Sequence, residues 1–272
     1  MKIMYCFLIL CFLMACSNEE ASGPASESDI LDSITNKNTG NKIGYLLDSS
    51  AFYADSVIRK YIRETLNTRD GEKFTYDIHK APLNPDKEID AIISVNRLAY
   101  AKQTAIESGH VAQAEKLAYM GPFNVFIFYD GGSNSFSIPV PVPSSPLLPL
   151  EISFANISSN QHKDLVVDFR IRNSSYKEVY FLFNNKPSKV FQWKNFDGLN
   201  TPNSEAYSFS FNPGNGPVRD ILVYNAKIEA PKDEIDPFIF KPKIVNSQDL
   251  RKRFFYVPAQ GKYFSTKDDP EG

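Results

Sequence analysis

Cysteine is almost absent from this sequence of 272 residues. The three cysteines, Cys6, Cys11 and Cys16, all lie within the first 16 positions. Because none follows, the rest of the chain has no disulfide and no thiol for nucleophilic catalysis. The folded part is therefore expected to be stabilised by its hydrophobic packing alone, and the chain is long enough for one or two cores.

Histidine is scarce too, and the three that occur, His79, His110 and His162, are far apart. None belongs to an HExxH motif or to another spacing typical of a metal site, so a surface or capping role is expected for each. The sequence also lacks a GxSxG motif, a Walker-type glycine loop and a GxGxxG motif. We therefore expect no cofactor, no bound metal and, more generally, no enzyme with a recognisable motif.

A surplus of positive charge is missing as well. The chain has 30 lysines and arginines against 32 aspartates and glutamates, a formal net charge of −2. Nucleic-acid binding depends on a basic surface that neutralises phosphates, and polybasic stripes attract anionic lipid headgroups. The composition thus predicts no nucleic-acid partner, and attachment to a membrane has to come from another part of the chain.

An apolar run at the N-terminus supplies that attachment. It extends from Ile3 to Ala15 and follows the positive Lys2, as in a secretory signal peptide. As a helix, these residues span roughly 20 Å at about 1.5 Å each, which is shorter than the ~30 Å hydrocarbon core of a bilayer. Cleavage is therefore favoured over a transmembrane anchor.

The end of this run, Leu13-Met14-Ala15-Cys16, resembles the lipobox of bacterial lipoproteins. The resemblance implies that residues 1–15 are a lipoprotein signal peptide. It also implies that Cys16 becomes the mature N-terminus and carries acyl chains such as palmitate, which hold the protein on a membrane. The resemblance covers only about the first twenty residues, so it implies location and lipidation and nothing about the folded part.

The residues after Cys16 predict the membrane to which the protein is sorted. Ser17 resembles the sorting position of Gram-negative lipoproteins that reach the outer membrane, and Glu19 with Glu20 resembles the surface-export signal of Bacteroidota lipoproteins. The expected location is the outer membrane, on either its periplasmic or its cell-surface face. Residues 16–42 are rich in Ser, Asn, Glu, Gly and Thr, which predicts a flexible lipidated tether. Within it, Asp32-Ser33-Ile34 resembles the O-glycosylation triplet of Bacteroidota proteins.

The sequence pattern of residues 43–121 predicts a helical region. A helix is predicted from Ser49 or Ser50 to about Asn67, because its apolar residues follow a 3.6-residue period. A short strand is expected at 73–78. Two further helices are predicted, from about Glu88 to Ser108 and over residues 111–120, as a helical hairpin.

From residue 122 to 272 the pattern changes to short strands separated by turn residues. Residues 123–129 and 135–142 flank a Gly-rich turn and predict a hairpin, and six or so further strands follow. The five prolines between residues 138 and 149 predict an edge strand that continues as a stiff polyproline-II connector rather than a docking peptide. The predicted fold class is α+β: an N-terminal helical segment of about three helices followed by an antiparallel β-sandwich.

Few residues stand out as candidates for a site. Trp193, the only tryptophan, lies near the predicted end of a strand with Asn195 and Asp197. The favoured role is to close one end of the core; the alternative is that the indole, beside Asn195 and Asp197, stacks on a sugar ring. Asp164 and Asp168 are expected to share the solvent-facing side of a strand. Asp130, with Ser133 and Asn134, offers oxygen ligands but is better explained by a hairpin turn than by calcium.

Three functions are compatible with these patterns. The first is a non-catalytic, membrane-anchored surface lipoprotein whose β-sandwich binds a ligand or partner in the cell envelope, such as a glycan or a protein. The second is a membrane-tethered hydrolase acting on glycans through two carboxylates, which requires two acids about 5–10 Å apart in one cleft. The third is a structural subunit of an envelope assembly for transport, motility or secretion. The missing catalytic motifs favour the first.

Overall fold

The computed structural model of this protein describes residues 55–111, 121–231 and 233–265. The expected signal peptide, Cys16, the tether at 16–42 and nearly all of the helix expected at 111–120 lie outside these ranges. Within them, no helix is both long enough and apolar enough to span a bilayer.

The described residues form two helices and thirteen strands. Their bounds, in chain order, are α3 (Asp55–Thr65), β1 (Thr75–Ala81), β2 (Asp90–Asn96), α4 (Leu98–Glu107), β3 (Gly121–Asp130), β4 (Ser135–Phe136), β5 (Val140–Ser144), β6 (Glu151–Ala155), β7 (Asp164–Ile171), β8 (Ser174–Phe183), β9 (Lys186–Asp197), β10 (Glu205–Asn212), β11 (Asp220–Ile228), β12 (Ile244–Val257) and β13 (Lys262–Ser265).

Sheet A contains β1 to β5, all paired antiparallel, in the order β1-β2-β3, with β4 and β5 both pairing with β3. Its two central strands are apolar on both sides. Ile93 and Ile127 pack against Ile58 and Ile62 of α3 on one face, while residues such as Phe126 belong to the core on the other face. Burial on both faces explains why β2 is a continuous apolar run rather than an alternating one.

The expected helix from about Glu88 to Ser108 is wrong over its first part, because residues 90–96 form β2 and only α4 is helical. Short apolar runs buried on both faces have no period that separates strand from helix, and here the β-branched Ile92, Ile93 and Val95 favour the strand. Because β1 pairs with β2 and β2 pairs with β3, the domain boundary expected between residues 121 and 122 runs within one sheet.

Sheet B contains β6 to β13, which pair antiparallel in strict chain order. The strand pairing is shortest in the middle of this sheet, because β9 and β10 pair only through Glu205 with Asp197 and Ala206 with Phe196. We call β6–β9 the proximal half and β10–β13 the distal half. The two halves enclose a shared aromatic core that includes Phe181 and Phe191 from the proximal half and Phe254 from the distal half.

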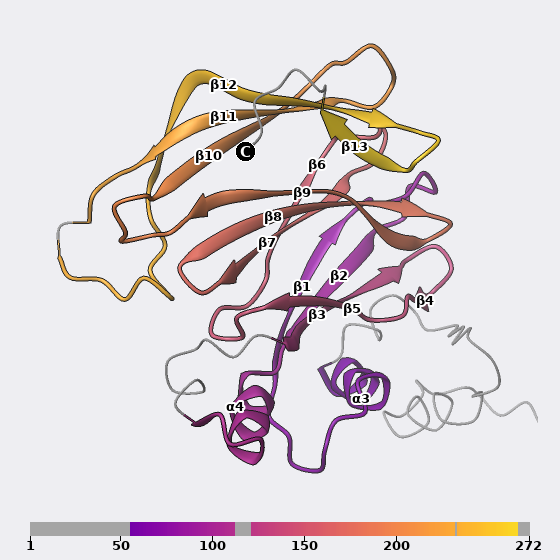
Figure 1. The fold of residues 1–272 in the computed structure, drawn as a ribbon. Coiled ribbons are helices and arrows are strands. Elements are labelled where there is room, and N and C mark those ends of the chain that lie inside the picture. Colours follow the sequence, from indigo (N-terminus) through magenta and orange to yellow (C-terminus); the bar gives the residue numbers. More distant parts are fainter. Residues whose placement is uncertain (1–54, 112–120, 232, 266–272) are drawn as a thin grey trace, which may run out of the picture. The chain divides into compact units, whose positions relative to one another are not determined.

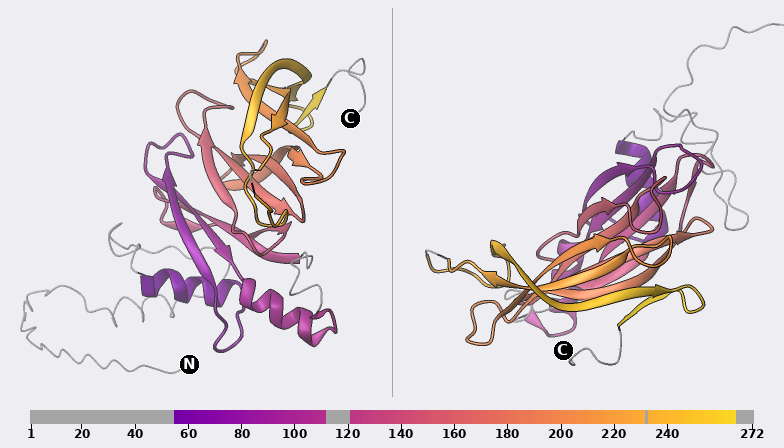
Figure 2. Two further views of the ribbon diagram at one scale, coloured as in Figure 1. Left: turned by 90° about the vertical axis from the view of Figure 1, so that its left-hand side faces the viewer. Right: turned by 90° about the horizontal axis from the view of Figure 1, so that it is seen from above.

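The described elements therefore stack in layers: the helices, sheet A, the proximal half and the distal half (Figures 1 and 2). Sheet A and the proximal half meet through Phe126 and Phe128 of β3 and Val167 and Tyr180 of β7 and β8. The prediction of antiparallel sheets packed face to face is thus confirmed in its coarse form, with fewer helices among the described residues than expected.

The layering corrects one detail of the sequence interpretation. The side of β7 that carries Asp164, Val166 and Asp168 was expected to face solvent, but Val166 is buried in the core between the two halves and Asp164 is only 3% exposed. Alternation along a single strand could not reveal this, because the covering layer is the distal half of the same sheet. The edge strand predicted in the Pro-rich segment is confirmed, since β5 is an edge strand of sheet A, but residues 146–147 form a turn before β6 rather than continuing as a polyproline-II connector.

Candidate functional site

A row of polar side chains crosses the proximal half where its apolar core ends. The strand register places Glu151 of β6 opposite Asp168 of β7, Asp168 opposite Lys177 of β8, and Lys177 opposite Trp193 of β9. Directly opposite residues in antiparallel strands share one face of the sheet. The neighbouring row on the same face, Val166 with Val179 and Phe191, belongs to the core, so the polar row marks the rim of that core.

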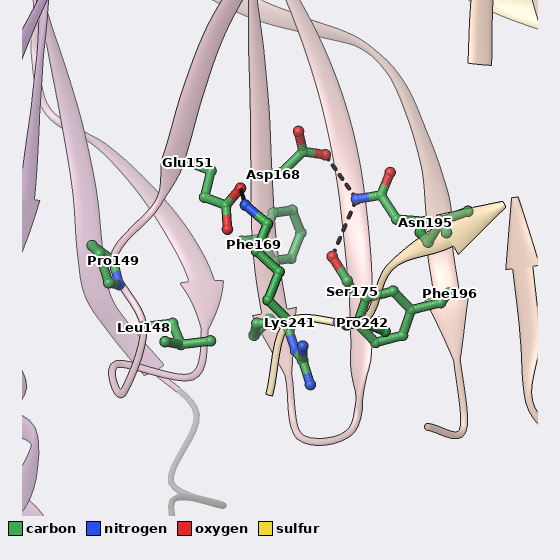
Figure 3. Close-up of a pocket in the computed structure, with 12 residues that line it drawn as sticks. Leu148, Pro149, Glu151, Asp168, Phe169, Ser175, Asn195, Phe196, Lys241 and Pro242 are labelled. Atoms are coloured by element: carbon green, nitrogen blue, oxygen red, sulfur yellow. Dashed lines mark hydrogen bonds and ion pairs between the residues drawn. The ribbon is translucent and has the colours of Figure 1, made fainter. Parts of the chain in front are cut away.

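The first pocket along this row, the Glu151 pocket, has a volume of about 200 Å³. Its lining includes Glu151, Asp168, Ser175, Asn195 and Lys241 (Figure 3). Lys241 Nζ lies 2.6 Å from Glu151 Oε2, and Asn195 Nδ2 donates to Asp168 Oδ1 at 2.7 Å and to Ser175 Oγ at 3.1 Å. These polar groups are engaged with one another, which leaves few free for a ligand.

Arg170 also lines this pocket, and its contacts are structural. It is 7% exposed and donates to the carbonyl oxygens of Phe240 (2.9 Å) and Pro237 (2.6 Å), while its guanidinium lies 4.7 Å from the centre of the Phe196 ring. Burial lowers the pKa of Arg170. The side chain thus fastens the connection between β11 and β12 to the edge of the proximal half.

The second pocket, the Trp193 pocket, lies beside the short paired stretch of β9 and β10. Its volume is about 280 Å³. It is lined by residues of β8, β9, β10 and β12, namely Tyr176, Gln192, Trp193, Lys194, Glu205, Tyr207 and Arg251. Aromatic residues together with amide, carboxylate and cationic groups in one concave site are typical of a binding pocket for a small polar ligand.

Trp193 takes part in both the core and the pocket. Its ring contacts Tyr207 edge-on, with centroids 6.0 Å apart, and Phe254, with centroids 5.3 Å apart. Its Nε1 is shielded from solvent and has no hydrogen-bond partner among the described residues. The two roles weighed for Trp193 are therefore combined: packing holds one part of the indole while another part lines the pocket.

The polar groups of the Trp193 pocket are only partly engaged. The Tyr207 hydroxyl donates to Glu205 Oε2 at 2.7 Å, and burial together with this bond raises the pKa of Tyr207 to about 12. Lys194 Nζ lies 2.5 Å from Asp197 Oδ2. Arg251, in contrast, has no hydrogen bond or ion pair to any residue that the structure describes. The pocket thus contains a cation that forms no direct ion pair with the described residues.

The three candidate residues on β9 do not meet in one site. Trp193 lines one pocket and Asn195 the other, while Asp197 accepts a bond from Ser174 Oγ at 2.5 Å. The bond from Lys194, with that from Ser174, lowers the pKa of Asp197. Sequence reasoning missed Glu205 and Arg251, because they join Trp193 only through the strand register.

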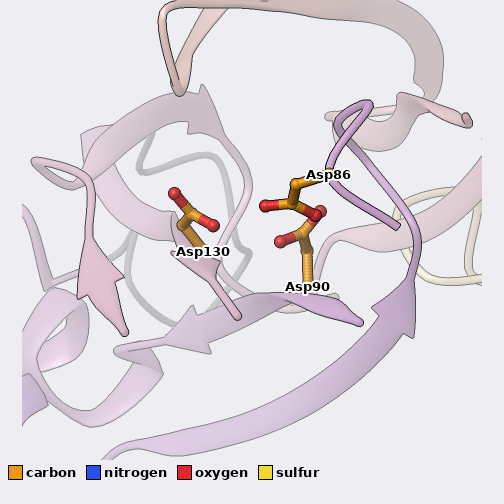
Figure 4. A group of neighbouring side chains, drawn as sticks. All are labelled: Asp86, Asp90 and Asp130. Atoms are coloured by element: carbon orange, nitrogen blue, oxygen red, sulfur yellow. The ribbon is translucent and has the colours of Figure 1, made fainter. Parts of the chain in front are cut away.

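A second group of acidic residues lies at one end of sheet A, where β2 begins and β3 ends. The carboxylates of Asp86, Asp90 and Asp130 point toward one another, with ligand oxygens within 4.8 Å (Figure 4). Asp90 Oδ2 accepts the Leu83 N–H at 2.8 Å, and its Oδ1 accepts the Gly131 N–H at 3.0 Å. Such a group has the chemistry to hold a cation, but the oxygens of the buried Asp90 already bind backbone amides that fix two loops.

Asp130 is explained by the turn that was expected for it. Its Oδ2 accepts from Ser133 Oγ at 2.6 Å and from Nδ2 of Asn185, a residue in the turn between β8 and β9. Asn134 does not join it, because its side-chain oxygen accepts the Tyr129 hydroxyl at 2.5 Å. Asp130 thus links the hairpin of sheet A to the proximal half.

Asp90 is expected to make stability depend on pH. Burial, reinforced by the neighbouring carboxylates, raises the pKa of Asp90 from 3.8 to about 6. The folded state therefore binds this proton before the unfolded state, and the free energy of unfolding rises as the pH falls from about 6 toward 4. Relative to the variant Asp90→Asn, the wild type should gain about 1–3 kcal/mol over this range, since one pKa unit corresponds to about 1.4 kcal/mol.

Chemical denaturation of both proteins at pH 7 and pH 4.5 measures this difference. The comparison with the variant also cancels the opposite contribution of His79, whose pKa is lowered by burial. Equal pH dependence in the two proteins contradicts the assignment to Asp90.

The remaining candidates have local roles. His79 Nε2 lies 3.1 Å from Ser94 Oγ, and His162 Nε2 lies 3.3 Å from Ser158 Oγ. Among the described residues, no histidine belongs to a group of potential metal ligands. Asp164 accepts the N–H of Ile157 at 2.9 Å, and burial raises the pKa of Asp164.

Comparison of the chain with protein-family models, curated proteins and solved structures finds no match. The residues and their geometry are therefore the only basis for a function.

Proposed function

We propose that this protein is a membrane-anchored, non-catalytic lipoprotein that captures a saccharide in the Trp193 pocket. The lipobox at residues 13–16 supports the anchor. The observation that carries the binding function is the pocket itself, in which Trp193 and two tyrosines line a concave site of about 280 Å³ together with polar groups. The chain has no surplus of basic residues, so its composition does not favour a nucleic-acid partner.

The composition of the pocket suits a sugar. A pyranose ring has apolar C–H faces that pack on aromatic rings, and hydroxyl groups that need hydrogen-bond partners at its rim. Trp193 and Tyr207, whose rings contact each other edge-on, supply the aromatic surface. Gln192 has a free amide donor group, because its described contact, from Lys189 Nζ at 3.0 Å, uses only the oxygen. The volume is at the small end for ligand pockets, which favours one or two sugar units at a time.

Glycan hydrolysis is the second candidate, and one observation favours it. Glu151 and Asp168 are directly opposite each other in the register of β6 and β7, and both line the Glu151 pocket (Figure 3). Two nearby acids are what such a reaction needs. However, Lys241 lies 2.6 Å from Glu151 and Lys177 lies 2.8 Å from Asp168, so both carboxylates are engaged in ion pairs rather than directed at a substrate. We therefore propose binding rather than cleavage.

The binding function is tested with the purified full-length protein in detergent. Trp193 is the only tryptophan, so its fluorescence reports ligand entry directly. We expect at least one of cellohexaose, maltohexaose and oligogalacturonate to change this fluorescence saturably, and calorimetry to show binding that weakens at least tenfold in Trp193→Ala.

The matched control is Phe264→Ala, which truncates a partly exposed aromatic residue of β13 that does not line the pocket. This variant should bind like the wild type. If both variants bind equally, or if none of the three saccharides binds, the proposed function is wrong. Gln192→Ala provides a second test should the Trp193 variant lose stability, because Gln192 is an exposed lining residue.

A further inference from the structure

We infer that the saccharide bound in the Trp193 pocket is anionic and that Arg251 binds its negative group. This inference rests on the proposed function and narrows it to sugars that carry a carboxylate or a sulfate. The pocket is lined by two cationic residues, Lys194 and Arg251, and by one acidic residue, Glu205.

The two cations of the pocket differ in their partners, and the carboxylate of Glu205 is bonded to a neutral hydroxyl, which supplies no counter-charge to it. Lys194 is paired with Asp197 at 2.5 Å, and Glu205 accepts the Tyr207 hydroxyl at 2.7 Å. Arg251 is half-buried and forms no ion pair or hydrogen bond with the residues that the structure describes. A half-buried guanidinium has lost part of its hydration, and it regains that free energy when a carboxylate or sulfate binds its parallel N–H groups.

A second cation strengthens the positive character of this region. Lys252 follows Arg251 on β12, and its ammonium lies 5.9 Å from the centre of the Trp193 ring. Among the described residues it too has no ion-pair partner. By contrast, the next cation of the strand, Arg253, is paired with Asp220. The unpaired cations of this stretch of β12 are therefore those beside Trp193.

The position of Arg251 relative to the rings fits a charged sugar. Arg251 and Tyr207 line the same pocket, and the charge of Arg251 opposes the rise in the pKa of Tyr207. A sugar that packs on the aromatic side chains would bring its ring substituents toward the guanidinium. A uronic acid meets both requirements, since its carboxylate is attached to the same ring that packs.

The test compares oligogalacturonate with its fully methyl-esterified form, which has the same rings without the charge. In the full-length protein, calorimetry and Trp193 fluorescence should show at least tenfold weaker binding of the ester. In Arg251→Gln, the acid should bind as weakly as the ester does, while the affinity for the ester stays unchanged. Arg251→Lys should recover only part of the loss, because an ammonium cannot form the paired bonds of a guanidinium.

The matched control is Lys227→Gln, which removes one positive charge from an exposed position of the neighbouring strand β11. It should change the affinity less than twofold. A sulfated oligosaccharide of the same length, measured in parallel, identifies which anion is preferred, and its binding should depend on Arg251 in the same way.

The outcomes separate this inference from the proposed function. Equal binding of acid and ester, or a preference for acid that persists in Arg251→Gln, overturns the inference but leaves saccharide capture standing. A preference that is lost in Arg251→Gln and kept in Lys227→Gln supports both.

Discussion

Replacement of Cys16 by serine is expected to release the protein from the membrane completely. The acyl chains predicted at Cys16 bury many methylene groups at about 0.8 kcal/mol each, and two or three chains act as a permanent anchor. Without the sulfur the chains have no attachment site, and the near-neutral chain has no basic stripe to replace them. Cells that express Cys16→Ser should show no incorporation of labelled palmitate, and the protein should leave the detergent phase in Triton X-114 partition.

The matched control is Cys11→Ser, which changes a cysteine within the same apolar run but outside the Leu13-Met14-Ala15-Cys16 motif. It should incorporate palmitate and partition as the wild type does. A Cys16→Ser protein that still enters the detergent phase with its label would disprove the anchor and, with it, the expected location.

Removing the carboxylate of Glu72 is expected to cause the largest loss of stability among charged residues. Arg97 Nε lies 2.6 Å from Glu72 Oε1, and the second bond, from Nη2 to Oε2, measures 2.9 Å. The side chains are only 10% and 2% exposed. In Glu72→Met the Arg97 guanidinium stays buried without a counter-charge, so we expect the free energy of unfolding to fall by about 3–5 kcal/mol.

Two comparisons make this measurement specific. The double variant Glu72→Met with Arg97→Met should recover most of the loss, because a buried ion pair replaced by apolar groups of similar volume is often close to neutral. Lys243→Ala, which breaks an exposed pair with Glu229, should be indistinguishable from wild type in the same denaturation experiment. If Glu72→Met is as stable as Lys243→Ala, the buried pair has no such importance.

Much of the β structure could be predicted because its signals are local. The hairpin of β3 and β4, the edge position of the Pro-rich β5 and the final hairpin of β12 and β13 all follow from turn residues and alternation. The wrong prediction of a helix at β2 arose because the local sequence pattern does not specify this strand. A strand buried between α3 and the proximal half has neither alternation nor helical period, and only its tertiary partners define it.

The same limit explains the candidate site. Trp193 could be singled out because it is a unique residue near the end of a strand, but its neighbours Glu205 and Arg251 are 12 and 58 positions later in the sequence. Whether β9 pairs with β10 along its length or only at its end depends on a bulged register that no single-sequence pattern specifies. Likewise, the burial of Asp164 depends on a layer that the chain adds later.

The chain-order pairing of sheet B has a consequence for how this protein acquires its structure. Each strand of sheet B after β6 pairs with the strand before it, so most ladders close short loops at a small cost in chain entropy. The sheet can thus grow hairpin by hairpin, and the slow step is expected to be the docking of the distal half on the proximal half. That docking needs no oxidant and no isomerisation of disulfides, because the participating residues are free of sulfhydryl groups.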